Sequence, residues 1–154
     1  MTESVEGRLR RFLLLLTIMV FLATLAELIL EEHTKETLQF IPFFLCAIGL
    51  IAVIAALLRP QRKSFLALRV SMTIVALGGM TGVAIHLINN YQFEQEIRPN
   101  SALSDLIVAT LKGANPLLAP GVLIFGALIA LLATYGHPAL AKHEAAPQLE
   151  EVRA

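Results

Sequence analysis

Cysteine is almost absent from this sequence, because Cys46 is the only one among 154 residues. A single cysteine excludes an intrachain disulfide and a zinc site built from several thiolates. The sequence also lacks a nucleotide-binding glycine loop, a nucleophile elbow and a His-Glu-x-x-His motif. The enzyme classes that depend on those motifs therefore have no support. No catalytic residue, substrate or reaction is predicted, and whether the protein is an enzyme stays open.

Four long apolar runs fill most of the chain, at residues 12–30, 39–58, 64–89 and 117–136. Each has about 19 residues or more, and about 20 helical residues span a hydrocarbon core of about 30 Å. The alternation of polar and apolar residues that a membrane β-barrel needs is missing, so the backbone must be satisfied within helices. Residues 1–136 are predicted to form an all-α, polytopic membrane protein with four transmembrane helices in an antiparallel bundle.

Basic residues predict how these helices are oriented. Three arginines at positions 8–11 precede the first run, and three basic residues at positions 59–63 lie between the second and third. Short loops rich in Lys and Arg stay on the cytoplasmic side, so we expect an inner-membrane protein with both termini in the cytoplasm. The outward segments carry seven acidic against three basic residues, which argues against nucleic-acid binding. Residues 137–154 are expected to form a mobile cytoplasmic tail.

The outward segment between the third and fourth runs is too long for a simple turn. Apolar residues at helical spacing predict a short amphipathic helix at about residues 101–112, with Asn100 or Ser101 as its cap and Gly113 at its end. Such a helix would lie on the outer membrane surface or over the mouth of the bundle.

The third run carries small and polar residues at regular spacing. Gly78, Gly82, His86, Asn90 and Glu94 form an unbroken i, i+4 series, so they share one helix face. Small residues allow another helix to approach closely, which predicts that this face packs inward and that His86 points into the bundle. Gly79, next to Gly78, belongs to the same predicted packing surface.

Glu27 lies on the first run at about the same depth as His86, and both helices run in the same direction. Glu27 and Glu31 sit at a helix C-terminus, where the helix dipole disfavours anions. A partly buried carboxylate there needs a partner or becomes protonated. We therefore expect Glu27 and His86 to approach within hydrogen-bonding or shared-ligand distance.

Three interpretations of that site are open. It is a structural hydrogen bond or ion pair from Glu27 to His86 or Arg98, or a transition-metal or proton-relay site, or a haem b site between His33 and His86. Intramembrane ionisable groups are functional candidates, and His with carboxylate suits Zn, Fe or Mn. The metal or polar site would be built from Glu27, Glu31, His33, His86 and Glu94, with Asn90 beside them.

The leading alternative is a non-catalytic accessory or assembly subunit of a larger membrane complex. The chain lacks a soluble domain and carries further small-residue helix faces at Gly121, Gly126 and Ala130. Association with a second copy, or with a larger membrane complex in the lipid bilayer, is therefore expected. Co-purification of a partner at fixed stoichiometry would distinguish this accessory role from a ligand-binding role.

The region around the outward segment resembles one group of proteins. His86-x-x-x-Asn90, Phe93-Glu94-x-Glu96 and the stretch Leu-Lys-Gly-Ala-Asn-Pro-Leu-Leu-Ala-Pro-Gly at residues 111–121 are similar to small bacterial four-span membrane proteins of unassigned function. The resemblance covers about 40 residues. It implies a four-helix membrane fold and points to the polar residues of the outward segment, and it implies no activity.

Overall fold

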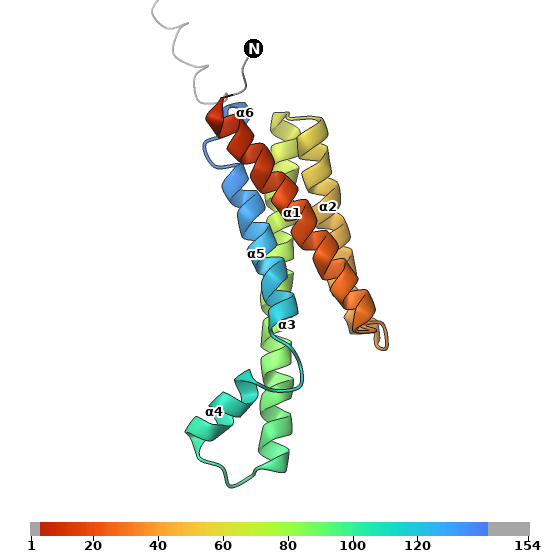
Figure 1. Cartoon of the computed structure of the whole chain (residues 1–154), viewed down its shortest axis with the longest axis vertical. Coiled ribbons are helices and arrows are strands. Elements are labelled where there is room, and N and C mark those ends of the chain that lie inside the picture. Colours follow the sequence, from red (N-terminus) through yellow and green to blue (C-terminus); the bar gives the residue numbers. More distant parts are fainter. Residues whose placement is uncertain (1–3, 142–154) are drawn as a thin grey trace, which may run out of the picture.

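The computed structural model describes residues 4–141, and all regular elements within them are helices (Figure 1). They are α1 (Val5–Leu30), the 3₁₀ helix η1 (Thr37–Phe40), α2 (Ile41–Leu58), α3 (Arg62–Ile97), α4 (Leu103–Leu111), α5 (Leu118–Ala133) and α6 (Pro138–Ala141). The expected mobile tail contributes α6 to this range, and residues 142–154 lie outside the described residues.

Four helices pack as a ring in the order α1, α2, α3 and α5. α1 packs against α2 and α5, and α3 packs against the same two helices. Within the described chain no Cα atom of α1 lies within 8 Å of a Cα atom of α3, so these two helices occupy diagonal positions. The N-terminal end of α1, the turn from α2 to α3 and the C-terminal end of α5 lie at one end of the bundle (Figure 1). We call this the basic end, because it carries the arginines at 8–11 and the basic residues at 59–63.

Phe21 fills the centre of the bundle between three helices. Its side chain is completely buried, and it lies against Gly49 of α2 and Gly126 of α5. A Cβ atom added at Gly49 would lie 2.5 Å from Phe21 Cε2, and one added at Gly126 would lie 3.0 Å from Phe21 Cε1. The absence of those side chains lets the ring enter. Gly126 and Ala130, expected on a face for association, are therefore used inside the bundle.

The glycines of α3 face two neighbouring helices. An added Cβ at Gly78 would lie 2.5 Å from Leu45 Cδ1 of α2. One at Gly79 would lie 2.9 Å from the Pro120 carbonyl oxygen of α5, and one at Gly82 would lie 3.0 Å from Pro120 Cβ. Close approach of α3 to α5 therefore depends on the absence of side chains on this face.

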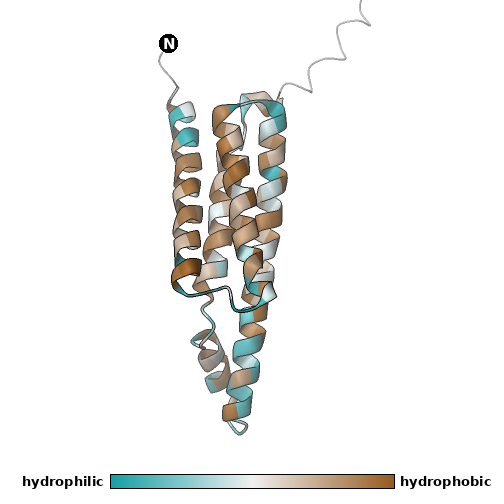
Figure 2. Cartoon of the chain, turned by 90° about the vertical axis from the view of Figure 1, so that its right-hand side faces the viewer, coloured by the Kyte–Doolittle hydropathy of each residue, from teal (hydrophilic) through white to brown (hydrophobic). Residues whose placement is uncertain are grey.

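Three helical segments are long and apolar enough to cross a membrane: α1, η1 with α2, and α3. Large apolar side chains on the outside of the bundle, such as Met19, Ile51, Leu77 and Leu128, are more than half exposed. Figure 2 shows the apolar colour along the packed helices and the polar colour at the basic end and on the far end of α3. Such a surface is typical of helices that face lipid.

The fourth apolar run forms a shorter helix than predicted. α5 has 16 residues, or about 24 Å at 1.5 Å per residue, which is less than a hydrocarbon core of about 30 Å. It ends before Gly136, which has a φ of +57°, and Pro138 follows. Both residues oppose continuation of the helix to the predicted end at residue 136.

α3 extends beyond the apolar run at residues 64–89, since it continues to Ile97, one turn past Glu94 of the predicted helix face. No Gly or Pro interrupts residues 83–98, and Pro99 ends the helix. With 36 residues it is about 54 Å long. α4 packs against the part of α3 that projects beyond α1 and α2 (Figure 1).

α4 occupies the middle of the helix predicted at residues 101–112, but its cap differs. Ala102 is the N-cap and makes no side-chain hydrogen bond, so the prediction of Asn100 or Ser101 as the cap is wrong. α4 also lies along the projecting end of α3, not over the mouth of the bundle.

Candidate functional site

The polar series on α3 leads into a junction between α3, α4 and the segment before α5. His86, Asn90 and Glu94 follow one another at one-turn spacing on α3, and each contacts a different part of the chain. We call residues 86–117 the distal arm. They comprise the last turns of α3, all of α4, and the connections on both sides of α4.

His86 ties the start of α5 to α3. Its Nδ1 lies 2.8 Å from the Pro116 carbonyl oxygen. A carbonyl oxygen can only accept a hydrogen bond, so Nδ1 carries the proton and donates. In the neutral ring, Nε2 then keeps its lone pair and can accept a hydrogen bond or bind a metal.

Asn90 holds the distal arm together from the inside. Its residue is 1% exposed, and its Nδ2 donates to the carbonyl oxygens of Thr110, at 3.1 Å, and Asn115, at 3.0 Å. Its Oδ1 accepts from the Asn115 backbone N–H at 2.9 Å. Three hydrogen bonds satisfy most of what a buried amide requires. One side chain of α3 thereby fixes the end of α4 and the following connection.

Gly113 makes room for this contact. A Cβ atom added at Gly113 would lie 2.5 Å from Cγ and 2.8 Å from Nδ2 of Asn90. Sequence reasoning assigned Gly113 only to the end of a helix, and its contact with Asn90 depends on how the chain folds back. Asn90 was recognised, whereas its partners Thr110 and Asn115 were missed, because both are bound through their backbone atoms.

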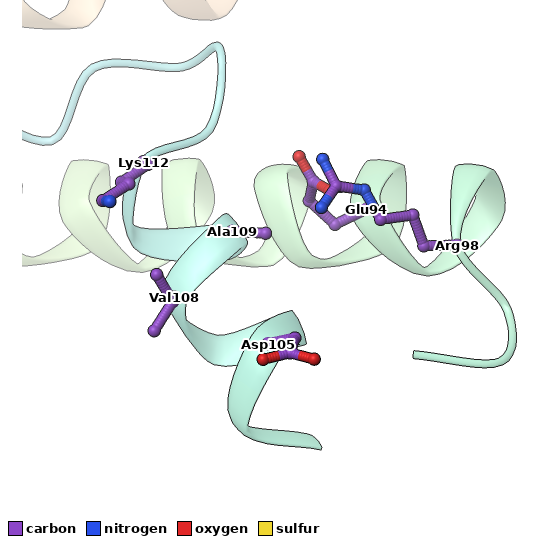
Figure 3. A pocket seen from close by; sticks show the side chains of 6 residues that line it. All are labelled: Glu94, Arg98, Asp105, Val108, Ala109 and Lys112. Atoms are coloured by element: carbon purple, nitrogen blue, oxygen red, sulfur yellow. The ribbon is translucent and has the colours of Figure 1, made fainter. Parts of the chain in front are cut away.

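Glu94 lies beside an open pocket between α3 and α4. Its residue is 7% exposed, and Oε2 lies 3.3 Å from Arg98 Nε in an ion pair. The angles of this pair do not make a hydrogen bond, so Oε2 is buried without a hydrogen-bond donor among the described residues. The pocket has a volume of about 470 Å³ and is lined by Glu94, Arg98, Asp105, Val108, Ala109 and Lys112 (Figure 3).

The predicted contact between Glu27 and His86 is absent from residues 4–141. Glu27 is half-buried, and its carboxylate has no hydrogen-bond or ion-pair partner in that range. The prediction paired the two residues because they lie at the same depth. However, α1 and α3 are diagonal in the ring, and none of their Cα atoms lie within 8 Å of each other. Glu31 is exposed and lies at the C-terminal end of α1 as predicted.

His33 is the member of the predicted set that interacts with His86. It lies in the connection between α1 and η1 and is half-buried. Burial, and then the charge of His86, lower the pKa of His33 below its ordinary value. The two imidazoles therefore lie within electrostatic reach of each other.

The described residues contain no group of three or more His, Cys, Asp or Glu side chains that could hold a metal ion. Zinc sites commonly use three or four protein ligands. Of the predicted set, Glu27 lies on α1 and Glu31 caps its C-terminal end, while Asn90 and Glu94 are engaged within the distal arm. Within this set, His33 and His86 are the two members whose charges act on each other.

Arg69 has a partner that the sequence did not indicate. Its Nε donates to Thr134 Oγ1 at 2.9 Å, and its Nη2 donates to the Thr134 carbonyl oxygen at 3.1 Å. The guanidinium thus binds the C-terminal end of α5, where the helix dipole favours a cation. The signal in the sequence was an arginine inside an apolar run. The run alone does not indicate which helix end this arginine binds.

Comparison with protein-family models, with curated proteins and with solved structures gives no match to this chain.

Proposed function

We propose that the chain is a four-span inner-membrane protein with its basic end in the cytoplasm. Three helices of sufficient length and apolarity support the membrane location. The fourth span would be α5, with Leu117 before it and residues 134–136 after it completing the crossing. Six basic residues at positions 8–11 and 59–63 lie at the same end, which agrees with the charge rule for cytoplasmic loops.

We further propose that the protein is a non-catalytic accessory subunit that docks another membrane protein through the distal arm. The observation that carries this proposal is the internal lock at Asn90, which joins the end of α4 and the following connection to the projecting end of α3. A segment fixed in this way presents a surface without the entropy cost of ordering it on binding.

The outer surface of the arm is apolar in a region that would lie beyond the bilayer. Phe93, Ile97, Ile107 and Leu111 are each at least half exposed. Since α3 exceeds the length of a membrane span by about 24 Å, lipid does not account for all of these side chains. Apolar residues ordered outside the membrane are typical of a protein–protein contact. The occupant we propose is a protein with an apolar patch above its own membrane domain.

The polar residues of the arm also favour this role over catalysis. His86 and Asn90 bind backbone atoms, and Glu94 is paired with Arg98. Each has a structural task, and no nucleophile lies beside a base in this group. An accessory role needs only the shape that these contacts maintain.

Purification in mild detergent tests the docking role. We expect one protein to co-purify at fixed stoichiometry and to be lost from the double variant Phe93→Ser with Ile107→Ser. Val5→Ser is the matched control, since Val5 is 73% exposed at the basic end, and it should retain the partner. A monomer in several detergents would contradict the proposal. If only a second copy of this chain is captured, the arm mediates self-association and the proposed partner protein is wrong.

Ligand binding at His33 and His86 is the second candidate, supported by their electrostatic interaction and by the lone pair on His86 Nε2. Two imidazoles are sufficient to ligate a haem iron on both sides, whereas a zinc ion would need further ligands. Elemental analysis and a visible spectrum of gently purified protein separate these possibilities. A Soret band or a stoichiometric metal, lost in His86→Ala and retained in Glu27→Gln, would establish the site. Loss in both variants would instead implicate Glu27.

A further inference from the structure

A small pocket opens at the basic end between the helix termini of the bundle. It has a volume of about 220 Å³ and receives residues from α1, α2, α3, α5 and the segment after α5. Its lining includes Gly7, Arg10, Arg11, Leu14, Phe65 and His137. This volume is below the range of about 300–1,000 Å³ that holds drug-sized ligands. A headgroup-sized molecule is therefore the appropriate occupant.

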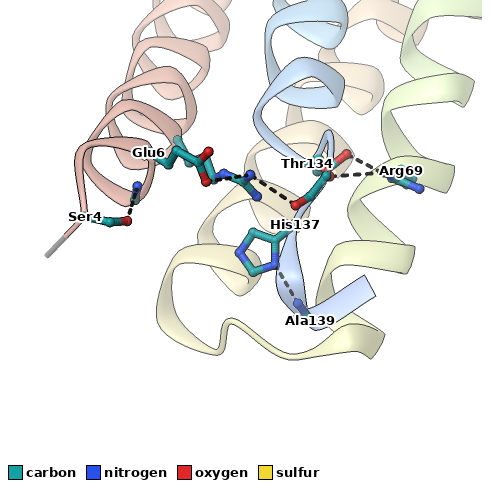
Figure 4. A network of polar contacts seen from close by, with 9 residues as sticks. Ser4, Glu6, Arg69, Thr134, His137 and Ala139 are labelled. Atoms are coloured by element: carbon teal, nitrogen blue, oxygen red, sulfur yellow. Dashed lines mark hydrogen bonds and ion pairs between the residues drawn. The ribbon is translucent and has the colours of Figure 1, made fainter. Parts of the chain in front are cut away.

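Arg10 lines this pocket and has one donor without a partner among the described residues. Its Nη2 donates to the Gly136 carbonyl oxygen at 3.2 Å and lies 3.6 Å from the Glu6 carboxylate, whose side chain is 80% exposed. Its Nη1 is buried and has no hydrogen-bond partner among the described residues. A buried cationic donor without an acceptor is costly, and an anion would satisfy it. Figure 4 shows the surrounding network, including Glu6, Thr134 and His137.

The remaining wall of the pocket is apolar. Leu14 and Phe65 are buried in the bundle core next to it, and the His137 ring packs on Phe65 with 3.9 Å between ring centroids. His137 Nδ1 accepts from the Ala139 N–H at 3.1 Å, so the ring is held in place. A cationic rim above an apolar wall matches a molecule with an anionic head and an apolar body.

We propose that this pocket binds the phosphate headgroup of an anionic membrane lipid, with Arg10 as the principal ligand and Arg11 beside it. Basic pockets between helices on the cytoplasmic side are typical sites for such headgroups. The inference rests on the proposed orientation of the basic end, and it is independent of docking by the distal arm. The Nη1 donor of the Arg10 guanidinium, which has no partner among the described residues, can form a charge-assisted hydrogen bond to a phosphate oxygen.

Binding is tested with the full-length chain in neutral detergent, to which phosphatidylglycerol, phosphatidylcholine or inorganic phosphate is added. We expect phosphatidylglycerol to raise the thermal unfolding midpoint and phosphatidylcholine to leave it unchanged. Arg10→Gln should weaken the phosphatidylglycerol effect by about tenfold in apparent affinity, the cost of losing a charge-assisted contact. Arg59→Gln, an exposed basic residue at the same end that does not line the pocket, should leave the effect unchanged.

Each alternative result has a defined meaning. Equal weakening by both variants, or equal stabilisation by phosphatidylcholine, would overturn the proposal. If inorganic phosphate raises the unfolding midpoint as much as phosphatidylglycerol does, the pocket binds free phosphate and the proposal of a lipid ligand is wrong. If Arg10→Gln does not fold, a photoreactive phosphatidylglycerol is crosslinked to the wild-type chain. Labelling of residues 7–14 or 133–137 supports the site, and labelling confined to other segments overturns it. The assay needs no partner protein, so its failure differs from a failure of docking.

Discussion

At the scale of single residues, the distal arm depends on a contact between one amide and one glycine. Asn90 reaches three backbone groups of a segment that lies 20–25 positions later in the chain. The absence of a side chain at Gly113 leaves the space that its amide occupies. Because backbone atoms are the partners, the sequence of α4 can vary without breaking these bonds. Substitutions at Asn90 or Gly113 cannot be compensated in the same way.

We expect Asn90→Ala to loosen the arm without unfolding the bundle. Three hydrogen bonds are lost and their backbone partners are left unpaired, at a cost of about 2–4 kcal/mol. Limited trypsin digestion should then cleave after Lys112 at a much higher rate. Asn89→Ala is the control, because Asn89 is exposed on the same helix, and its digestion should match that of the wild type. Equal protection of Asn90→Ala would show that the clamp does not hold the arm.

Gly113→Ala is expected to act through the same contact. The new Cβ would lie 2.5 Å from Asn90 Cγ, so the amide or the connection must shift, at a cost of about 1–3 kcal/mol. The matched control is Gly121→Ala, since a Cβ there meets no atom within 4 Å and alanine favours the helix. We expect faster cleavage after Lys112 in Gly113→Ala alone. Identical cleavage rates in the two variants would contradict the packing argument.

At the scale of elements, the close pair is α3 with α5. A Cβ at Gly79 would lie 2.9 Å from the Pro120 carbonyl oxygen, a backbone atom that cannot rotate away. Gly79→Leu should therefore separate the two helices and lower the thermal unfolding midpoint in detergent by several degrees, as about 1–3 kcal/mol of overpacking would. Gly121→Leu, placed in open space on α5, should change the midpoint little. A larger decrease of the unfolding midpoint in Gly121→Leu than in Gly79→Leu would contradict the assignment of Gly79 to the packed face between α3 and α5.

Periodicity in the sequence was sufficient to predict which residues share a helix face. The glycines of α3 and the series from His86 to Glu94 follow from i, i+4 spacing alone. Periodicity does not state which helices are neighbours in a ring, so Glu27 was paired with a residue on the diagonal helix. The predicted span ended at residue 89, whereas the i, i+4 series already continued the helix face to Glu94, and α3 ends at Ile97. Hydropathy indicates whether a helix lies in lipid or in water, whereas Pro99 indicates where α3 ends.

Docking of the segment after α5 should depend on pH. Burial, and then the charge of Arg10, lower the pKa of His137 in the docked state. When the segment detaches, the pKa returns to about 6.5, so the detached state binds more protons. The stabilisation from neutral His137 is therefore present above about pH 6.5 and is lost as the pH falls through the lower pKa of the docked state.

Amide hydrogen exchange of residues 137–140 provides a local measurement of this effect. Exchange corrected for intrinsic rates should be faster at pH 5 than at pH 8, and the difference should disappear in His137→Gln. His33 also has a lowered pKa, but it lies at the opposite end of the bundle. His33→Gln therefore serves as the control and should keep the pH dependence. A difference that persists in His137→Gln would place the titrating group elsewhere.

At the scale of the whole molecule, burial of Cys46 makes the orientation measurable. Cys46 is completely buried in α2, so a water-soluble maleimide should not reach it in the folded protein, and single cysteines can be added without removing it. Lys35 lies in the exposed connection between α1 and η1, and Arg62 lies at the basic end. The proposed orientation places Lys35 outside the cell and Arg62 inside.

An impermeant maleimide added to intact cells should therefore label Lys35→Cys and leave Arg62→Cys unlabelled. After the cells are opened, both variants should react, while the wild-type chain stays unlabelled because its one thiol is buried. Labelling of Arg62→Cys from outside would mean that the orientation is opposite to the proposed one. The distal arm and its exposed apolar residues would then lie in the cytoplasm. In that case the docking partner would have to be sought on the cytoplasmic side, and the pocket at Arg10 would face the outer leaflet.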